Sequence, residues 1–480
     1  MCGIIGIVAQ SPVNQTLINS LKSLQHRGQQ AAGVATLDGN LMHLKKELGL
    51  VKEVIKEYDL TYLKGNIGIG HVRYPTAGSA NDPEQAQPFY VNSPFGIMLA
   101  HNGNLTNAAK LRNDVLSKNH RHVRTKSDSE ILTNVFAFEL EQLTVQKDLD
   151  NYKIFTAITN LNQRIKGGYA VVSIIANYGL VAFRDPNGIR PLILGKRDEI
   201  DGTSSYIIAS ESCALETNGF DIIRDLKPGE AIIIDQQGKL ESKICHPNPK
   251  LNICIFEYVY LSRPDSIIEQ VPVQEARRLM GKYLAQEIAK YNLDIDAIIP
   301  VPDTPRTIAI EVAEYLKKPY REGFVKNHFM GRTFMLPDQQ QRKIAVKSKL
   351  SPIKLEFKDK NILLVDDSIV RGTTSREIIN IVRSCGAKKV YIASAAPQVK
   401  YPNVYGIDMP THHELIAYQK SDEEIRQSLG ADQVIFQKLE DLKQSITEIN
   451  SEITNFDASC FDGQYITNDV DLNQLDQKYC

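Results

Sequence analysis

The second residue of the chain is a cysteine, within the N-terminal sequence MCGIIGIV. A small residue after the initiator methionine usually allows that methionine to be removed, and the mature chain would then begin with the Cys2 thiol. The α-amine of such a residue has a reference pKa of roughly 7.7–8.0, so it can accept the thiol proton directly or through one water. A cysteine at this position is more often without a role, so other residues must support a nucleophile.

Residues that would complete a site for cleaving an amide stand at the ends of two predicted strands, in GHVRYPT and LAHNGNL. A thiolate that attacks a carboxamide needs two hydrogen-bond donors for the developing oxyanion, and the Asn102 amide and the Gly103 N–H can supply them. Arg73 suits the carboxylate of an amino-acid substrate, and Asp128 suits its ammonium group. Each residue alone is more often a turn, a solvated charge or a helix cap, but together with the terminal thiol they predict a site that cleaves the amide of an amino-acid substrate.

A second motif, NILLVDDSIVRGTTS at 361–375, has the pattern of a phosphate site. An apolar strand ends in Asp366 and Asp367, which can hold ribose hydroxyls or a hydrated Mg²⁺. A glycine-containing turn then enters a helix, so the backbone N–H groups of 371–375 can cradle a phosphate. Three hydroxyls add donors, those of Thr373, Thr374 and Ser375. No lysine follows the glycine, which distinguishes the motif from the phosphate loop of nucleotide triphosphatases.

The elements that must position these residues change in rhythm near residue 250. Before it, short β-rich runs such as IIGIVA, NIGIGHVRY and GYAVVSIIA are closed by turn residues and separated by a few helical patterns. One of these helices opens with Ser127 and Glu130 at the spacing of a capping box. Many strands with clustered helices predict stacked sheets between helix layers.

From about residue 250 the pattern alternates strictly between strands and helices. An apolar helical face runs from Ala276 to Ile288, and helices are predicted over 304–317 and 374–385 between the strands AIIPVP, NILLVDD and KKVYIASAA. Such units predict a parallel, doubly wound sheet, which binds ligands at the carboxyl ends of its strands. The stretch His246–Lys250 is a plausible domain boundary, and the polar segment 337–349 is predicted to be a mobile loop.

Composition excludes several classes of protein. The 480 residues predict two to four domains at roughly 150 residues each. With 56 basic and 57 acidic residues the net charge is −1, which predicts no general attraction to nucleic acid or to an anionic membrane. No apolar run approaches the ~20 residues of a membrane span, and the N-terminus does not read as a secretion signal. Seven scattered cysteines without a CxxC pair argue against a disulfide framework, so the predicted compartment is the cytoplasm.

The runs MCGIIGI, QHRGQQAAG, GHVRYPTAG, HNGNL and SDSE resemble the glutaminase domain of the N-terminal-nucleophile amidotransferases. The resemblance implies a four-layer α/β/β/α sandwich, which agrees with the stacked sheets. It also implies that Cys2 is the nucleophile and that Asn102 and Gly103 form the oxyanion hole. Glutamine would then be held by Arg73, Thr76 and Asp128.

The motif at 361–375 resembles the donor signature of type I phosphoribosyltransferases. The resemblance implies that phosphoribosyl pyrophosphate (PRPP) is bound by Asp366, Asp367, Ser368, Arg371, Gly372, Thr373, Thr374 and Ser375. In IIPVPDT it implies that Thr304 joins Asp366 and Asp367 at a metal site. The run KNHFMGRTF resembles the loop that orders over the donor, in which Lys326 and Arg332 would meet the pyrophosphate; a solvated basic loop is the alternative. Phe329 stands where the family usually has tyrosine.

Both domains in one chain match the arrangement of the amidophosphoribosyltransferase family, over about residues 1–470. This implies a glutaminase domain at 2–248, a phosphoribosyltransferase domain at 249–470 with a mobile loop at 326–349, and a tail at 471–480. The implied reaction transfers glutamine-derived ammonia to PRPP, giving phosphoribosylamine, pyrophosphate and glutamate in the first committed step of purine biosynthesis. The family further implies one Mg²⁺ per subunit, an interior ammonia tunnel, feedback by purine nucleotides and a homodimer or homotetramer, with no nucleic-acid or membrane partner.

Some members of the family carry an iron–sulfur cluster on four cysteines. In this sequence only Cys254 and Cys460 stand at the corresponding positions, and Asp457 and Asn403 occupy the other two. Because such clusters are held by four thiolates in nearly all cases, we expect none here.

Two alternatives remain open from the sequence. One is another amidotransferase with the same glutaminase domain, such as glucosamine-phosphate synthase, glutamate synthase or asparagine synthetase. The motif at 361–375 argues against it, and release of pyrophosphate would separate the two. The other is a regulatory protein that senses PRPP while binding nucleic acid. The near-zero net charge and the complete glutaminase set argue against that, and glutamine hydrolysis would exclude it.

Overall fold

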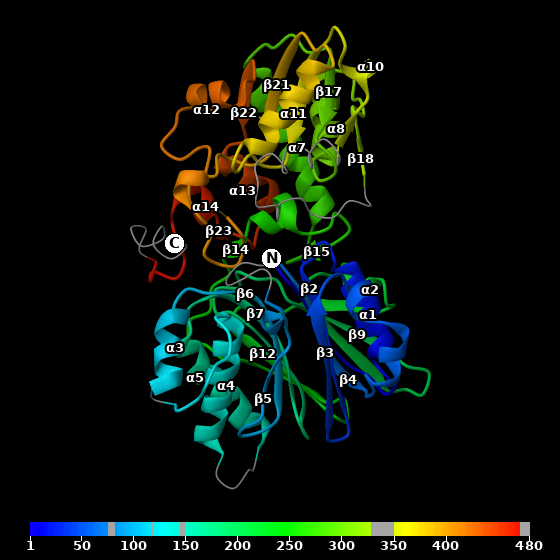
Figure 1. Cartoon of the computed structure of the whole chain (residues 1–480), viewed down its shortest axis with the longest axis vertical. Coiled ribbons are helices and arrows are strands. Elements are labelled where there is room, and N and C mark those ends of the chain that lie inside the picture. The colour runs from blue at the N-terminus through cyan, green and yellow to red at the C-terminus, as the bar shows by residue number, and fades with distance from the viewer. Residues whose placement is uncertain (75–81, 118, 145–148, 328–349, 410, 471–480) are drawn as a thin grey trace.

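The computed structural model describes residues 1–74, 82–117, 119–144, 149–327, 350–409 and 411–470. The chain forms two bodies stacked along its longest axis, with the first half of the sequence in one and the second half in the other (Figure 1). Residues 245–252, which include the predicted boundary, have neither helix nor strand. The N-terminus lies near the junction of the two bodies (Figure 1).

The first body contains two antiparallel sheets. The seven-stranded sheet has the order β11-β9-β10-β1-β4-β2-β3. Its strands are β1 Gly3–Val8, β2 Ala31–Asp38, β3 Leu41–Leu48, β4 Ile67–Arg73, β9 Ile193–Asp198, β10 Ser204–Ala209 and β11 Asp221–Asp225. The six-stranded sheet has the order β13-β12-β8-β7-β6-β5. Its strands are β5 Phe89–Val91, β6 Ile97–Leu105, β7 Gly167–Ile175, β8 Gly179–Arg184, β12 Glu230–Asp235 and β13 Leu240–Ile244.

Helices cover the outer face of each sheet. The seven-stranded sheet packs against α1 Asn14–Ser23, α2 Val51–Val54 and α6 Cys213–Glu216. The six-stranded sheet packs against α3 Ala108–Ser117, α4 Asp128–Leu143 and α5 Asn151–Arg164. A third core of apolar side chains lies between the two sheets. These are the four α/β/β/α layers that the sequence predicted (Figure 1).

The apolar run at the N-terminus follows from the position of β1. This strand pairs with both β10 and β4, so it lies inside the sheet rather than at an edge. Ile5 and Ile7 pack on the helices, whereas Ile4 and Val8 pack between the sheets. Since both faces are covered, the strand is apolar throughout instead of alternating.

The second body is built on a parallel sheet with the order β17-β20-β21-β22. Its strands are β17 Ala297–Pro300, β20 Asn361–Asp366, β21 Lys389–Ser394 and β22 Gln433–Phe436. Helices α11 Thr373–Ser384 and α12 Asp422–Leu429 pack on one face, and α7 Val273–Ala289 and α8 Arg306–Leu316 pack on the other. A short hairpin of β18 Phe324–Lys326 and β19 Leu350–Pro352 precedes α10 Lys354–Phe357. The sheet is parallel and doubly wound, as predicted.

The segment from residue 439 onward completes the core at the junction. It contains α13 Leu439–Thr447, β23 Phe456–Asp457 and α14 Ser459–Asp462. Strand β23 pairs with β14 Ile253–Cys254, which is followed by the short helix η3 Glu257–Leu261 and the small hairpin of β15 Ile267–Ile268 and β16 Val271–Pro272. The rings of Phe256 and Phe461 stack with their centroids 5.4 Å apart.

Several local predictions need correction. Ser127 caps α4 by accepting a hydrogen bond from the Ser129 N–H, but no capping box forms. The Glu130 carboxylate instead accepts from the N–H groups of Arg124 and Thr125, because the preceding loop folds back over it. Helix α8 begins at Arg306 and not at 304, and α11 spans 373–384 instead of 374–385. The loop residues 328–349 and the tail 471–480 lie outside the described residues.

Candidate functional site

Cys2 lies at the start of β1, between the two sheets of the first body. Its side chain is buried, and its Sγ is 3.6 Å from the carbonyl oxygen of Tyr74 at the end of β4. Its backbone N–H donates to Oδ1 of Asn102, on β6 of the opposite sheet, at 3.3 Å. The pairing of Gly3 with Val72 brings the motif GHVRYPT to Cys2. The stacking of the two sheets brings the motif LAHNGNL to it. Two motifs that are distant in the sequence therefore meet at Cys2, as predicted.

Of the two predicted oxyanion donors, Asn102 contacts Cys2 directly, and Gly103 is its neighbour on β6. Asn102 is fully buried, and its Nδ2 has no hydrogen-bond partner within the described part of the chain. Leaving a buried donor unsatisfied costs about 1–3 kcal/mol, so this amide is available for a group that the protein itself does not supply. Gly103 has φ +137°, and a Cβ at this position would lie 2.0 Å from the Gly168 carbonyl oxygen. Only glycine fits there.

Arg73 interacts electrostatically with both Cys2 and Asp128. Burial lowers the pKa of the Arg73 guanidinium, while the nearby Cys2 thiol and Asp128 carboxylate act in the opposite direction. Asp128 is the first residue of α4, and its Oδ2 accepts from the Leu105 N–H at 3.0 Å. The same oxygen is 4.0 Å from Nδ1 of His101. Thr76 lies outside the described residues.

One important residue was missed from the sequence. Arg27, within QHRGQQ, is buried and donates from Nε to the Cys2 carbonyl oxygen at 2.9 Å. Its other nitrogens donate to both oxygens of Glu257, at 2.9 and 3.0 Å, and to Glu211. Although burial opposes it, these carboxylates raise the pKa of Arg27. Arg27 therefore joins the nucleophile to the second body, a pairing across 230 residues that no local pattern reveals.

The second body also covers the Cys2 pocket through the segment 404–408. A Cβ on Gly406 would lie 2.8 Å from Gly103, and Nδ2 of Asn104 donates to the Val404 carbonyl oxygen at 2.9 Å. The Tyr74 hydroxyl is 3.5 Å from Oδ2 of Asp408. The part of β6 that carries the oxyanion donors, residues 102–104, is called the oxyanion turn, and it is thus in direct contact with the other domain.

The paired acids lie at the carboxyl end of β20. Burial raises the pKa of Asp367 to about 6. Burial and the adjacent Asp367 raise the pKa of Asp366 well above its ordinary value. The hydroxyls of Ser368 and Thr304 both reach Asp367, that of Ser368 at 2.9 Å. Thr304 therefore meets the acids as predicted, although it comes from the loop after β17.

The phosphate cradle has the predicted turn. Gly372 has φ +72° and precedes the first residue of α11, and a Cβ there would lie 2.2 Å from the Ile416 side chain. Thr373 and Thr374 are half-buried, and Ser375 is buried. Arg371 is exposed and lies 3.5 Å from the carboxylate of Glu414.

Lys326, on β18, reaches the same end of the sheet and forms an ion pair with Asp303. Arg332 and Phe329 lie outside the described residues. Among the residues that are described, no group of three or more His, Cys, Asp or Glu side chains could hold a metal ion. A cation at Thr304 and the acids would therefore depend on a substrate or water for its remaining ligands.

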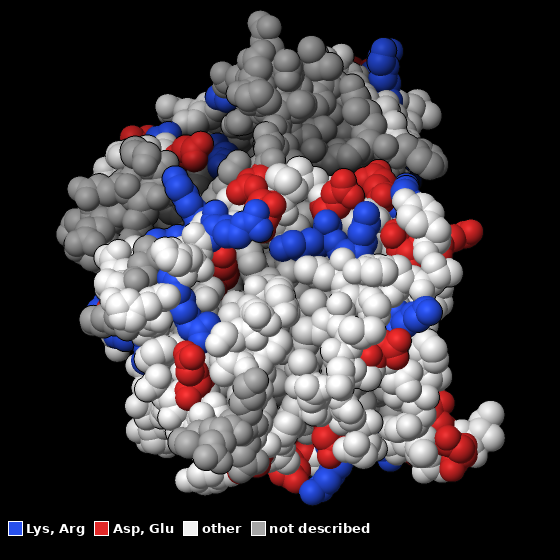
Figure 2. All heavy atoms as spheres, turned by 60° about the horizontal axis from the view of Figure 1, so that its bottom comes forward, with Lys and Arg blue, Asp and Glu red and all other residues white. Residues whose placement is uncertain are grey.

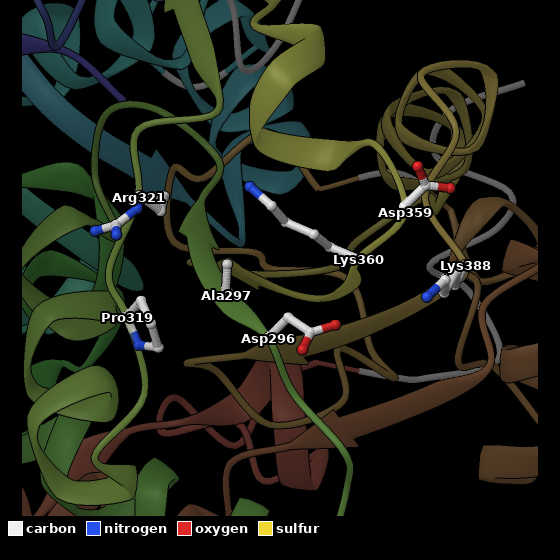
Figure 3. Close-up of a pocket in the computed structure, with 7 residues that line it drawn as sticks. All are labelled: Asp296, Ala297, Pro319, Arg321, Asp359, Lys360 and Lys388. Carbon is white, nitrogen blue, oxygen red and sulfur yellow. The ribbon is translucent and has the colours of Figure 1, made fainter.

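A cavity of about 310 Å³ opens at the amino ends of the strands of this sheet, opposite the paired acids (Figure 3). It is lined by Asp296, Ala297, Pro319, Arg321, Asp359, Lys360 and Lys388. Asp296, Lys360 and Lys388 directly precede β17, β20 and β21. Because open parallel sheets bind ligands at the carboxyl ends of their strands, this cavity is not the donor site.

Two of the four positions that correspond to an iron–sulfur cluster carry side chains that form hydrogen bonds within their own turns. Oδ1 of Asn403 accepts from the N–H groups of Tyr405 and Ile407, and Oδ1 of Asp457 accepts from Ser459. Burial raises the pKa of the Cys254 thiol to about 12 and that of Cys460 well above its ordinary value. Both thiols are therefore protonated at neutral pH.

The face of the molecule that Figure 2 shows carries charges of both signs. On the face in Figure 2, Lys and Arg side chains gather in a band across the middle, with Asp and Glu side chains among them. Among the described residues, none of the helices has the length and apolar character needed to cross a membrane.

Known proteins match both bodies. A glutamine amidotransferase domain model matches residues 75–217, and a phosphoribosyl transferase domain model matches residues 270–403. Amidophosphoribosyltransferase of Escherichia coli (strain K12) is 54% identical over 479 residues, which cover 99% of this chain and 94% of that protein. The enzyme of the same name from Saccharomyces cerevisiae is 47% identical over 490 residues, with 100% and 95% covered.

A solved structure extends the match to three dimensions. Glutamine phosphoribosylpyrophosphate amidotransferase from B. subtilis, complexed with ADP and GMP, superimposes with a TM-score of 0.85 at 37% identity. The match covers 98% of this chain and 99% of that one.

Proposed function

The chain belongs to the amidophosphoribosyltransferase family, and from this premise we propose that it makes 5-phosphoribosylamine from glutamine and PRPP, with release of glutamate and pyrophosphate. The observation that carries the proposal is the buried Asn102 amide next to Cys2, whose Nδ2 has no hydrogen-bond partner among the described residues. In the same chain, Asp366 and Asp367 end a parallel strand ahead of the Gly372 turn. The first arrangement suits attack on an amide, and the second suits a sugar pyrophosphate.

In the first half-reaction, we propose that Met1 is removed and that the α-amine of Cys2 takes the thiol proton. The Cys2 nitrogen already lies against Oδ1 of Asn102, which would hold the amine in place. The thiolate attacks the side-chain carbonyl of glutamine, and the Asn102 amide and the Gly103 N–H stabilise the oxyanion. The C–N bond then breaks, ammonia leaves with the returned proton, and water hydrolyses the γ-glutamyl thioester to glutamate.

The residues around the pocket would hold the rest of glutamine. Arg73 would pair with its carboxylate and Asp128 with its ammonium group, because the two side chains lie close together beside the thiol. Thr76 would add a further contact.

In the second half-reaction, ammonia attacks C1 of the ribose from the face opposite the pyrophosphate, which departs with its bonding electron pair. Asp366 and Asp367 would hold the ribose hydroxyls, and the N–H groups of the Gly372 turn would hold the 5-phosphate. The PRPP site would be completed by the hydroxyls of Ser368, Thr373, Thr374 and Ser375. Three cationic side chains would join them, those of Arg371, Lys326 and Arg332.

The oxygen donors of Thr304, Asp366 and Asp367 fit Mg²⁺, with one ion per subunit. Burial raises the pKa values of both carboxyls, and a cation bound between them would favour their charged forms. When bound, Mg²⁺ would neutralise charge on the departing pyrophosphate.

An iron–sulfur cluster does not fit the corresponding positions. Only Cys254 and Cys460 could ligate iron through sulfur, and the side chains of Asn403 and Asp457 are used in turns. We propose that the protein contains no cluster. Elemental analysis of protein purified without oxygen should find no bound iron, and stoichiometric iron would overturn this.

Ammonia would reach the second site without entering bulk solvent. The contact between Gly103 and Gly406 supports this, since the oxyanion turn faces the other domain.

Feedback by purine nucleotides is proposed because the B. subtilis relative was solved with ADP and GMP. A homodimer or homotetramer is proposed from the family resemblance. The cytoplasm is proposed because the six cysteines in the described residues are all free and buried, as suits a reducing compartment.

The proposal is tested by product balance. The purified chain, given glutamine, PRPP and Mg²⁺, should release glutamate and pyrophosphate in equal amounts. Glutamate without PRPP-dependent pyrophosphate would indicate another member of the wider amidotransferase group. Absence of glutamate would exclude a glutaminase altogether.

A further inference from the structure

A short segment, 82–88, lies against three parts of the glutamine pocket. It carries Gln85 and Gln87, whose side chains are 3% and 5% exposed. Buried glutamines are uncommon, and each amide must be satisfied by hydrogen bonds. The partners of these two amides are residues of the pocket wall.

Gln85 contacts the arginine that would hold the substrate carboxylate. Its Oε1 accepts from NH2 of Arg73 at 2.7 Å, and its Nε2 donates to Oδ2 of Asp82 at 3.1 Å. The two partners fix the direction of the amide, because a guanidinium can only donate and a carboxylate can only accept. Because Asp82 holds the amide nitrogen of Gln85, the amide oxygen of Gln85 is held in a position where it accepts from Arg73.

Gln87 bridges two other elements. Its Oε1 accepts from the His101 N–H at 2.7 Å, and its Nε2 donates to the Ser129 hydroxyl at 2.9 Å. His101 precedes Asn102 on β6, and Ser129 follows Asp128 on α4. One side chain therefore spans the strand that carries the oxyanion donors and the helix that carries the acid for the substrate ammonium.

The position of Gln87 is itself fixed. Its carbonyl oxygen would lie 2.0 Å from a Cβ on Gly33, so strand β2 packs directly on the backbone of the segment. A second tie between α4 and β6, from the Leu105 N–H to Asp128, lies on the other side of Asn102 and Gly103. A third contact, between Nδ1 of His101 and the Ser129 hydroxyl at 3.1 Å, joins the same strand and helix. Gln87 adds two hydrogen bonds to this contact, so its loss would set the distance between the helix end and the Asn102–Gly103 stretch less tightly.

We propose that Gln85 and Gln87 are positioning residues of the glutaminase site. Gln85 orients the Arg73 guanidinium toward the substrate carboxylate, and Gln87 sets the spacing between the oxyanion donors and Asp128. This inference rests on the proposed function. The two residues differ in their kinetic signature, since Arg73 binds substrate whereas the oxyanion donors act in the transition state.

The test is steady-state glutaminase kinetics in the presence of PRPP. Gln85→Leu should raise the KM for glutamine about 10- to 100-fold with little change in kcat, the effect of a lost hydrogen bond to a charged group. Gln87→Leu should lower kcat at least about 10-fold, because misplaced oxyanion donors stabilise the transition state less. Gln236→Leu, the same change at an exposed glutamine, is the matched control and should behave as wild type.

A rescue separates orientation from general packing. In Asp82→Asn/Gln85→Glu the donor and the acceptor are exchanged, so the acceptor facing Arg73 is restored at unchanged total charge. The KM should return to within about threefold of wild type, whereas Gln85→Glu alone places two carboxylates together and should not. For Gln87, the double-mutant cycle with Ser129→Ala should show non-additive losses of kcat, because both changes remove the contact between these two side chains; Ser129→Ala removes the contact with His101 in addition.

The outcomes are distinct. If wild type hydrolyses glutamine and both leucine variants keep its kcat and KM, the inference is overturned while the proposed function stands. If wild type does not hydrolyse glutamine, the proposed function itself fails. If a leucine variant also loses ammonia-dependent pyrophosphate release, its fold is damaged. For Gln85 the exchanged pair then decides, with recovery of the KM supporting the inference and no recovery overturning it. For Gln87 the Ser129→Ala variant decides, with a lowered kcat for glutamine supporting the inference and an unchanged kcat overturning it.

Discussion

The buried Asn102 amide makes two different contributions that substitutions can separate. Its Oδ1 accepts from the Cys2 nitrogen, while its Nδ2 has no partner in the described chain. Asn102→Asp keeps an acceptor oxygen for Cys2 but replaces the open donor with a second acceptor. Asn102→Leu, of similar volume, removes both.

The magnitude follows from the role of a single oxyanion donor. Losing one typically raises the barrier by about 2.7–4 kcal/mol, and about 1.36 kcal/mol corresponds to a tenfold change in rate. We expect kcat for glutamine hydrolysis to fall about 10²- to 10³-fold in Asn102→Leu and at least as far in Asn102→Asp, where a negative charge faces the oxyanion. The KM for glutamine should change less than about threefold, since the donor is used only in the transition state.

The assay is glutamate release at saturating PRPP, with ammonia-dependent pyrophosphate release measured on the same preparations. Asn92→Asp, at an exposed asparagine after β5, is the matched control and should leave both activities unchanged. An Asn102→Asp enzyme with kcat within tenfold of wild type would refute the reasoning, because the acceptor contact with Cys2 would then matter and the open donor would not.

Three further predictions concern both sites. Arg73→Lys should raise the KM for glutamine about 10- to 100-fold in the same assay, because lysine cannot pair with a carboxylate through two parallel donors. Because burial raises the pKa of Asp367 to about 6, titration calorimetry should show PRPP and Mg²⁺ binding weakening as pH falls below that value, and Asp367→Asn should make this dependence shallower, since Asp366 still titrates. The folded chain holds this proton more tightly than the unfolded chain, whose pKa is near 3.8, so Asp367→Asn should also raise the melting temperature of the ligand-free protein at pH 8. Gly103→Ala should abolish glutamine-dependent turnover and lower the melting temperature, since its Cβ would lie 2.0 Å from a backbone oxygen; normal activity would contradict the positive-φ turn.

Elements that are buried along their length, and whose ends are marked by turn or acidic residues, could be predicted from the sequence. Strand β20 and helix α11 were predicted to within one residue, because the apolar run, the paired acids and the glycine turn follow one another without a break. Strand β1 was equally clear from its apolar residues. In contrast, β3 at the edge of its sheet is half-exposed along most of its length and has no strong alternation, so it was not predicted.

The site was predictable where a residue type itself implies a chemistry. Cys2, Asn102, Gly103, Arg73 and Asp128 come together as expected, although their roles stay predictions. Contacts that depend on three-dimensional packing were not accessible. Arg27 meets Glu257 across the domain junction, and Gln85 and Gln87 have no local signature, because a glutamine in a loop is usually solvated.

The two-site account is tested most directly by Cys2→Ala assayed with each nitrogen source. Glutamine-dependent formation of phosphoribosylamine should disappear, because the only proposed nucleophile is gone. Turnover of PRPP with an added ammonium salt should continue, because the second site lies on another domain and uses none of the Cys2 chemistry. Loss of both activities in a folded variant, or survival of the glutamine-dependent one, would contradict a Cys2 glutaminase that feeds ammonia to a separate PRPP site.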